Sequence, residues 1–156
     1  MLAEAGALDA EHLDALLDLA AELVGPDAET TALVRHACRL FVTGANLTVP
    51  TGTIVLRKGY GLGAQAMAAG SFKAPLFCVA WPTGEFGGMG LEGAVRLGFR
   101  KELEAEAGPA AREALFQQLL GRMYDVGKAT EAAAHLEIDA VIDPAETRAV
   151  VLRALA

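Results

Sequence analysis

The stretch from Thr53 to Met67 places the strongest constraint on how this chain can fold. Its first four residues favour a β-strand, three glycines follow at alternate positions from 59 to 63, and residues 64–67 are good helix formers. The stretch therefore predicts a strand, a glycine-rich turn and a helix. Glycine lets the backbone approach a ligand closely, and the first N–H groups of a helix lack an intrahelical acceptor. We expect the turn to bind an anion through its backbone.

Length and charge narrow the class of protein. A chain of 156 residues with 53% hydrophobic content can form one domain with a substantial core. Residues 1–34 hold eight acidic residues and no Lys or Arg, and the net charge is −7. We therefore expect no nucleic-acid partner, because no basic stripe faces phosphates. We also expect a cytoplasmic protein with no membrane association, since no apolar run reaches the length of a membrane span and no basic secretory start is present. Cys38 and Cys78 are expected to be reduced core residues.

Periodicity and capping residues predict alternating helices and strands. A second glycine-rich turn, at 83–90, follows the apolar run that ends at Trp81. Two strand–loop–helix units in tandem place both loops at one edge of a sheet, where open α/β sheets bind ligands. The predicted helices are 9–24, 28–43, 91–107, 110–124, 130–136 and a last helix from Pro144 capped by Asp143; the predicted extended segments are 47–56, 75–81 and 138–142.

The sequence of the first turn can be compared with known binding and catalytic motifs. Gly59, Gly61 and Ala64 satisfy the G-x-G-x-x-A dinucleotide pattern, but the next strand ends in Ala80 and Trp81 without the acidic residue that binds the ribose. A phosphate loop with Gly-Lys-Ser/Thr, a Gly-x-Ser-x-Gly elbow and a metal-ligand cluster are all missing from the sequence. What remains is a loop of backbone donors, each worth about 3 to 4 kcal/mol when it stabilises an oxyanion. The alternative is that the glycines only permit close packing of helix on sheet.

Three motifs, in order along the chain, resemble one known family. They are residues 57–67, which begin Arg-Lys-Gly-Tyr-Gly, residues 80–95, and residues 142–148. They resemble the C-terminal part of the carboxyltransferase (β) subunits of biotin-dependent acetyl-CoA and propionyl-CoA carboxylases. The resemblance implies an α/β, crotonase-like (ββα-spiral) partial domain, with a short and mostly parallel sheet flanked by helices. It covers residues 25–156, whereas 1–24 would be an acidic amphipathic helix outside it.

The resemblance also implies a site and a reaction. In the family, the carboxyl group of carboxybiotin is transferred to the enolate of an acyl-CoA, and backbone N–H groups hold the oxyanions. The matching donors here are Leu62 and Gly63, and Gln65 falls where the family tunes acyl-chain preference. Biotin would be carried on a separate carrier domain, with no covalently bound cofactor and no metal in this chain. The residues implied to contact biotin are Gly61, Leu62, Gly63, Ala64, Gly88, Met89 and Gly90.

Two departures from the family bear on these expectations. Leu62 stands where propionyl-type members have glycine, and we expect its side chain to narrow the pocket. The CoA-binding domain of the family does not appear in the sequence, so that half of the site would come from another chain. The implied partners are an acyl-CoA, a biotin carboxyl carrier or biotin carboxylase subunit, and further copies that associate through an exposed sheet edge. We expect the isolated chain to be inactive; the alternative function is a non-catalytic, truncated crotonase-like assembly module.

Overall fold

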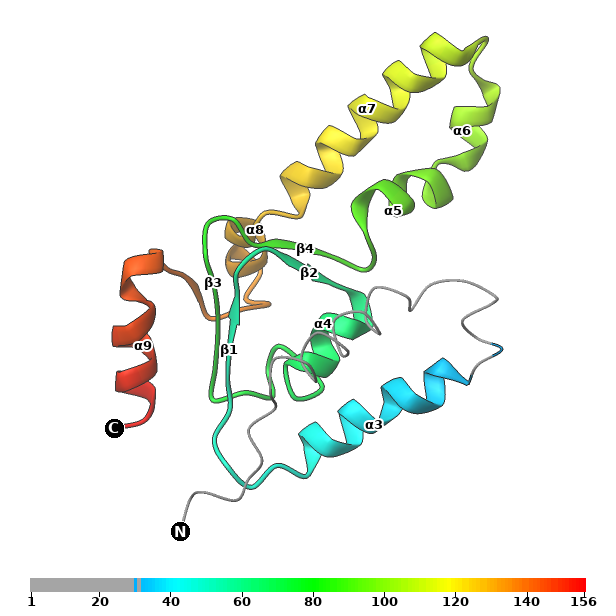
Figure 1. The fold of residues 1–156 in the computed structure, drawn as a ribbon. Coiled ribbons are helices and arrows are strands. Elements are labelled where there is room, and N and C mark those ends of the chain that lie inside the picture. The colour runs from blue at the N-terminus through cyan, green and yellow to red at the C-terminus, as the bar shows by residue number, and fades with distance from the viewer. Residues whose placement is uncertain (1–29, 31) are drawn as a thin grey trace. The chain divides into compact units, whose positions relative to one another are not determined.

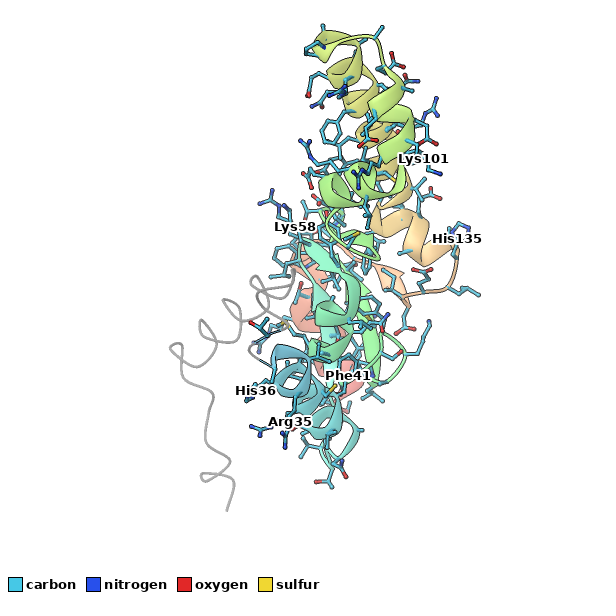
Figure 2. The ribbon with its side chains drawn as sticks, turned by 90° about the vertical axis from the view of Figure 1, so that its right-hand side faces the viewer. Arg35, His36, Phe41, Lys58, Lys101 and His135 are labelled. Carbon is cyan, nitrogen blue, oxygen red and sulfur yellow. The ribbon has the colours of Figure 1, made fainter. Side chains whose placement is uncertain are left out.

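The computed structural model describes residue 30 and residues 32–156, which fall into two compact units, 1–39 and 40–156. The first described helix, α3 (Leu33–Ala45), crosses the boundary, and each unit is described by itself. In the first unit, the side chains of Arg35 and His36 are exposed, as expected of surface residues (Figure 2). The predicted helix over 9–24 and the capping residue Asp27 lie outside the described residues.

The second unit contains two small sheets in which every strand pair is parallel (Figure 1). In the first sheet, β3 (Phe77–Ala80) lies between β1 (Gly52–Val55) and β5 (Ala140–Val141). The second sheet pairs β2 (Lys58–Tyr60) with β4 (Glu85–Gly87). A central parallel strand is covered on both faces, so it needs a continuous apolar run, and β3 has one.

The two sheets arise from a structural repeat of strand, strand and helix. The first copy is β1, β2 and α4 (Gly61–Met67), and the second is β3, β4 and α5 (Leu91–Gly98). Equivalent strands pair, because Thr53 on β1 is opposite Cys78 on β3 and Tyr60 on β2 is opposite Gly87 on β4. Each turn of the chain therefore adds one strand to each sheet. This ββα spiral confirms the predicted fold class.

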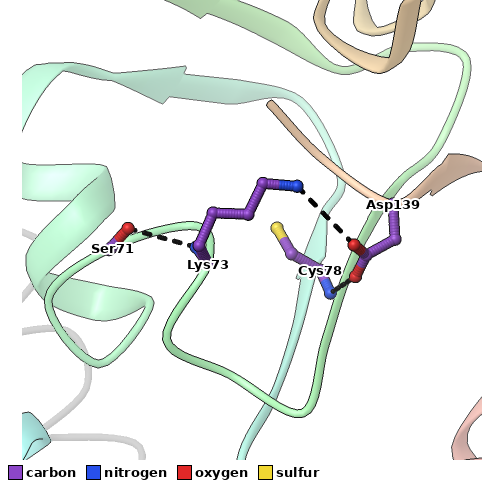
Figure 3. Close-up of polar contacts among 4 residues, drawn as sticks. All are labelled: Ser71, Lys73, Cys78 and Asp139. Carbon is purple, nitrogen blue, oxygen red and sulfur yellow. Dashed lines mark hydrogen bonds and ion pairs between the residues drawn. The ribbon is translucent and has the colours of Figure 1, made fainter. Parts of the chain in front are cut away.

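A hydrophobic core joins the two sheets to α8 (Ala129–Ala134). The ring of Phe72 meets that of Phe86 edge-on at 5.5 Å between centroids. Next to this core, Asp139 accepts a hydrogen bond from the N–H of Cys78 and pairs with the ammonium group of Lys73 (Figure 3). The buried members of this core are Val55, Cys78, Ala80, Phe86, Ala129, Ala132 and Ile138.

A helical hairpin begins with the last helix of the second repeat (Figure 1). Its buried residues form a separate core. It consists of α5, α6 (Arg100–Ala105) and α7 (Pro109–Val126). The single helix predicted over 91–107 is wrong, because the chain bends at Phe99 between α5 and α6. The bend lets Phe99 and Leu103 both pack into the hairpin core. On α7, Ala114 is exposed, whereas Phe116 is buried beneath the guanidinium group of Arg96.

The C-terminal segment begins with the predicted cap. Asp143 accepts from the N–H of Ala145 at 2.8 Å, and the Glu146 carboxylate accepts from the N–H of Asp143, which completes a capping box. A short 3-10 helix, η1 (Pro144–Glu146), leads into α9 (Thr147–Ala154). The indole N–H of Trp81 donates to the Thr147 hydroxyl at 3.0 Å and thereby links β3 to α9.

Other expectations differ from the structure at particular residues. The extended segment predicted over 47–56 is a strand only over 52–55. Leu40 and Phe41 of α3 are half-buried. Cys38 and Cys78 are both free, but Cys38 is exposed, so only Cys78 is a core residue. Within the described residues, no helix combines the length and apolar character that a membrane crossing requires.

Candidate functional site

The two glycine-rich segments meet where β2 and β4 end. Tyr60 is opposite Gly87 in the parallel pair, so the residues that follow each strand are neighbours. A Cβ atom placed on Gly61 would lie 2.7 Å from the carbonyl oxygen of Gly88. Gly61 also has a φ angle of 58°, in the left-handed region that glycine adopts without steric cost. Close backbone contact and helix entry both require glycine at position 61.

The sequence predicted a single glycine-rich turn over residues 59–63, but in the structure these glycines belong to different elements. Gly59 lies within β2, Gly61 begins α4, and Gly63 is in the first turn of that helix. In the second segment, residues 85–87 form β4, so the turn itself is confined to the residues between Gly87 and Leu91. The term turn pair is used below for residues 61–63 and 88–90.

The first turn of α4 presents backbone donors without intrahelical acceptors. Leu62 and Gly63 are the second and third helical residues, and no side chain caps the helix. The side chain of Leu62 is 70% exposed. A Cβ atom on Gly63 would meet no other atom within 4 Å. The N–H groups of these two residues therefore lie at an open surface at the start of the helix.

A cavity of about 750 Å³ borders the turn pair. Phe72, Phe86, Leu91 and Met123 supply apolar walls, while charged and polar groups from α8, its C-terminal end and the loop before β3 complete the lining. His135 is exposed there, and its Nδ1 lies 2.9 Å from the Glu131 carbonyl oxygen (Figure 2). The titratable lining residues are Lys73, Glu131, His135 and Glu137.

Some of the site residues predicted from the sequence line the cavity, and others do not. Gly61, Gln65 and Gly88 line it, and the first two share one face of α4 because they are four residues apart. The residues that do not line it are Leu62, Gly63, Ala64, Met89 and Gly90. The Leu62 side chain therefore does not narrow this cavity. The residue with a positive φ in this turn is Gly61, not Leu62.

Two tyrosine–glutamate hydrogen bonds near the turn pair were not predicted. The Tyr60 hydroxyl donates to Glu85 Oε2 at 2.5 Å, and the Tyr124 hydroxyl donates to Glu92 Oε1 at 2.8 Å. Burial and the Glu85 carboxylate raise the pKa of Tyr60 well above its usual range, so the hydroxyl keeps its proton. The first turn of α5 and the Tyr124 hydroxyl lower the pKa of Glu92. Only the register of β2 against β4 reveals the first pair, because its members lie 25 residues apart.

Glu92, Glu85, Lys58 and Phe86 surround the two turns. Glu92 lies at the N-terminus of α5, and Glu85 lies on β4. Lys58 forms no ion pair with any residue that the structure describes, although its charge helps to lower the pKa of Glu92. Phe86 is a core residue. In the described part of the chain, no group of three His, Cys, Asp or Glu residues is placed to hold a metal ion.

Comparison with known proteins assigns this chain to a family. The carboxyl transferase domain family matches residues 13–156. The methylmalonyl-CoA carboxyltransferase 12S subunit of Propionibacterium freudenreichii subsp. shermanii is 36% identical over 144 residues, which are 90% of this chain and 26% of that protein. The biotin-dependent acetyl-/propionyl-coenzyme A carboxylase beta6 subunit of Mycobacterium tuberculosis is 35% identical over 142 residues, covering 90% of this chain and 30% of that protein. The chain belongs to the carboxyl transferase domain family.

Solved structures agree with this assignment. A single-chain, multi-domain long-chain acyl-CoA carboxylase is 61% identical to this chain, with a TM-score of 0.72, and the match covers 83% of this chain and 12% of that one. The transcarboxylase 12S hexamer, solved with methylmalonyl-coenzyme A and methylmalonic acid bound, is 34% identical with a TM-score of 0.71, covering 85% of this chain and 25% of that one. The chain thus spans about a quarter of the length of the curated relatives given above, as part of a carboxyltransferase domain.

Proposed function

We propose that this chain supplies the biotin-facing half of a carboxyltransferase site, which transfers a carboxyl group from carboxybiotin to the enolate of an acyl-CoA. The observation that carries the proposal is the contact between Gly61 and Gly88, which brings two glycine turns together beside a cavity of about 750 Å³. Family membership supplies the reaction class. The turn pair offers backbone donors and no side-chain nucleophile, as expected where the protein stabilises charge rather than attacking the substrate.

The residues at the turn pair fit a neutral bicyclic ring with a polar ureido edge. The open surface at the start of α4, next to the cavity, suits this ring, because the free N–H groups of Leu62 and Gly63 can donate to the ureido oxygen. Biotin, when bound, would deliver the carboxyl group. The N–H groups of Leu62 and Gly63 would hold the developing oxyanion. Gly61, Ala64, Gly88, Met89 and Gly90 would let the ring approach the backbone, since none carries a long polar side chain.

Acyl-CoA selection and assembly form the second part of the proposal. Gln65 lines the cavity from the same helix as the proposed donors, and we propose that it influences which acyl chain is accepted. The CoA-binding half of the site would lie outside this sequence, and a biotin-bearing carrier would deliver the carboxyl group. Support comes from the relatives, which include a biotin-dependent carboxylase subunit and a hexameric transcarboxylase. The isolated chain is expected to bind biotin without turnover.

A titration with biotin methyl ester tests the proposal. Amide chemical shifts of the 15N-labelled chain are followed up to millimolar ligand, and we expect changes confined to residues 61–65 and 87–90. Two variants at one position isolate the N–H donor. Gly63→Ala keeps the N–H and adds a methyl group where no atom lies within 4 Å. Gly63→Pro removes the N–H in the first helical turn, where proline is tolerated.

The proposal requires Gly63→Ala to bind as the wild type does and Gly63→Pro to lose most of the shift changes. Equal binding by both variants would show that the Gly63 N–H is not a donor. A folded wild-type chain that shows no shift changes at millimolar ligand would overturn the half-site proposal. That result would favour the alternative, a crotonase-like module that assembles with other chains without taking part in catalysis.

A further inference from the structure

We propose that the hydrogen bond between Tyr60 and Glu85 positions the turn pair, and that these two residues thereby set the geometry of the backbone donors. The inference rests on the proposed function for its catalytic meaning, but not for its structural content. Neither residue is assigned a direct contact with biotin or with the acyl group. Both are positioning residues, which act through the turns that follow them in sequence.

The placement of the pair supports this role. Tyr60 is the last residue of β2 and the residue from which α4 starts, and Glu85 is the first residue of β4. Their hydrogen bond, at 2.5 Å, therefore runs diagonally across the ladder from the end of one strand to the beginning of the other. The Tyr60 ring also covers Gly87, because a Cβ atom on Gly87 would lie 3.7 Å from Tyr60 Cδ1. The Tyr60 side chain thus bonds to the first residue of β4 and lies beside the last.

The shortness of the ladder makes an additional constraint necessary. Only three residue pairs join β2 to β4, from Lys58 and Glu85 to Tyr60 and Gly87. A slip of one residue would move Gly88 away from Gly61 and separate the two turns. A charge-assisted hydrogen bond across the ladder resists such a slip because it is about twice as strong as a neutral one. The other edge of β4 is held separately, where Phe86 N–H donates to the carbonyl oxygen of Gly127 at 2.7 Å.

The chain contains a matched control for this hydrogen bond. Tyr124 donates to Glu92 with the same chemistry, but the bond links α7 to α5 within the helical hairpin and does not cross the β2–β4 ladder. Tyr124→Phe therefore removes a hydroxyl group and leaves a carboxylate without its donor, as Tyr60→Phe does. The comparison separates loss of a tyrosine–glutamate hydrogen bond in general from loss of this one.

Backbone order parameters of the full chain test the inference. We expect the amides of Gly61, Leu62, Gly63 and Gly88 to have order parameters of about 0.85 in the wild type and below about 0.6 in Tyr60→Phe. Tyr124→Phe should leave them unchanged. Glu85→Gln should also keep them near the wild-type value, because an amide oxygen still accepts from the tyrosine hydroxyl. Glu85→Ala should repeat the effect of Tyr60→Phe, and it serves in its place if that variant does not fold.

Unchanged order parameters in both Tyr60→Phe and Glu85→Ala would overturn the inference, as would an equal loss in Tyr124→Phe. The biotin methyl ester titration is then repeated on the folded variants. If Tyr60→Phe loses the ligand-induced shift changes and Glu85→Gln keeps them, ligand binding depends on this positioning. If the wild type itself does not bind, the proposed function fails, whereas the order parameters still decide whether the pair positions the turns.

Discussion

The backbone N–H of Cys78 donates a 2.7 Å hydrogen bond to Asp139 Oδ2, which joins the central strand to a residue 61 positions later in the chain. The other carboxylate oxygen of Asp139 lies 3.7 Å from the ammonium group of Lys73 (Figure 3). Asp139 immediately precedes β5, so this carboxylate marks the point at which β5 joins β3.

Replacing Asp139 with Ala should lower the free energy of unfolding by about 1 to 2 kcal/mol, because the charge-assisted bond to Cys78 N–H is lost. Asp139→Asn should cost less, since the amide oxygen can still accept. Lys73→Gln isolates the ion pair, whose two side chains are more than half exposed, and should change stability by less than about 0.5 kcal/mol. Urea unfolding measures all three variants. A loss in Lys73→Gln as large as that in Asp139→Ala would assign the stabilisation to the ion pair instead.

The buried thiol of Cys78 should make the protein less stable in alkali. Burial raises its pKa to about 11, whereas an unfolded chain loses this proton near the usual cysteine pKa of about 8.5. Between these values the unfolded state binds fewer protons, so the free energy of unfolding should fall as pH rises, by up to about 1.4 kcal/mol per pH unit. Urea midpoints measured from pH 8 to 11 test this, with Cys78→Ala as the reference. An equally steep decline in that variant would point to other groups, such as Tyr60.

The contact between the turns predicts opposite effects of alanine at two nearby glycines. Gly61→Ala should destabilise the protein by about 2 kcal/mol or more, because it forces a side chain into a left-handed φ and toward the Gly88 carbonyl oxygen. Gly63→Ala should be neutral or stabilise by up to about 1 kcal/mol, because alanine favours the helix and the added methyl group meets open space. Thermal unfolding of the two variants gives the comparison. Similar midpoints would show that the turns can separate at no cost.

The link between Trp81 and Thr147 should hold α9 against the sheet. Trp81→Phe and Thr147→Val each remove one partner of the 3.0 Å hydrogen bond, and each should cost about 1 kcal/mol. The double variant should cost less than the sum of the two single variants, because the second change removes an interaction that is already broken. A double-mutant cycle by urea unfolding measures this coupling. Strict additivity would mean that the hydrogen bond does not contribute to stability.

Local sequence signals predicted the elements that depend on neighbouring residues. The apolar run ending at Trp81 identified the central strand, because a strand covered on both faces needs apolar residues throughout. Asp143 followed by Pro144 identified a helix start, because a carboxylate cap and a proline act on the residues directly after them. The bend at Phe99 escaped prediction, since apolar residues recur every four positions from Leu91 to Leu103, as they would in one continuous helix.

The sequence by itself determined the two glycine-rich segments, their order after two strands and the family to which they belong, because each of these is a property of adjacent residues. Only the tertiary structure decided that Gly61 contacts Gly88, that Tyr60 bonds to Glu85 and that Leu62 points away from the cavity. The reason is that these relationships depend on the parallel register of β2 and β4, which hydrogen bonds between distant backbone segments establish and which leaves no periodic pattern in the sequence.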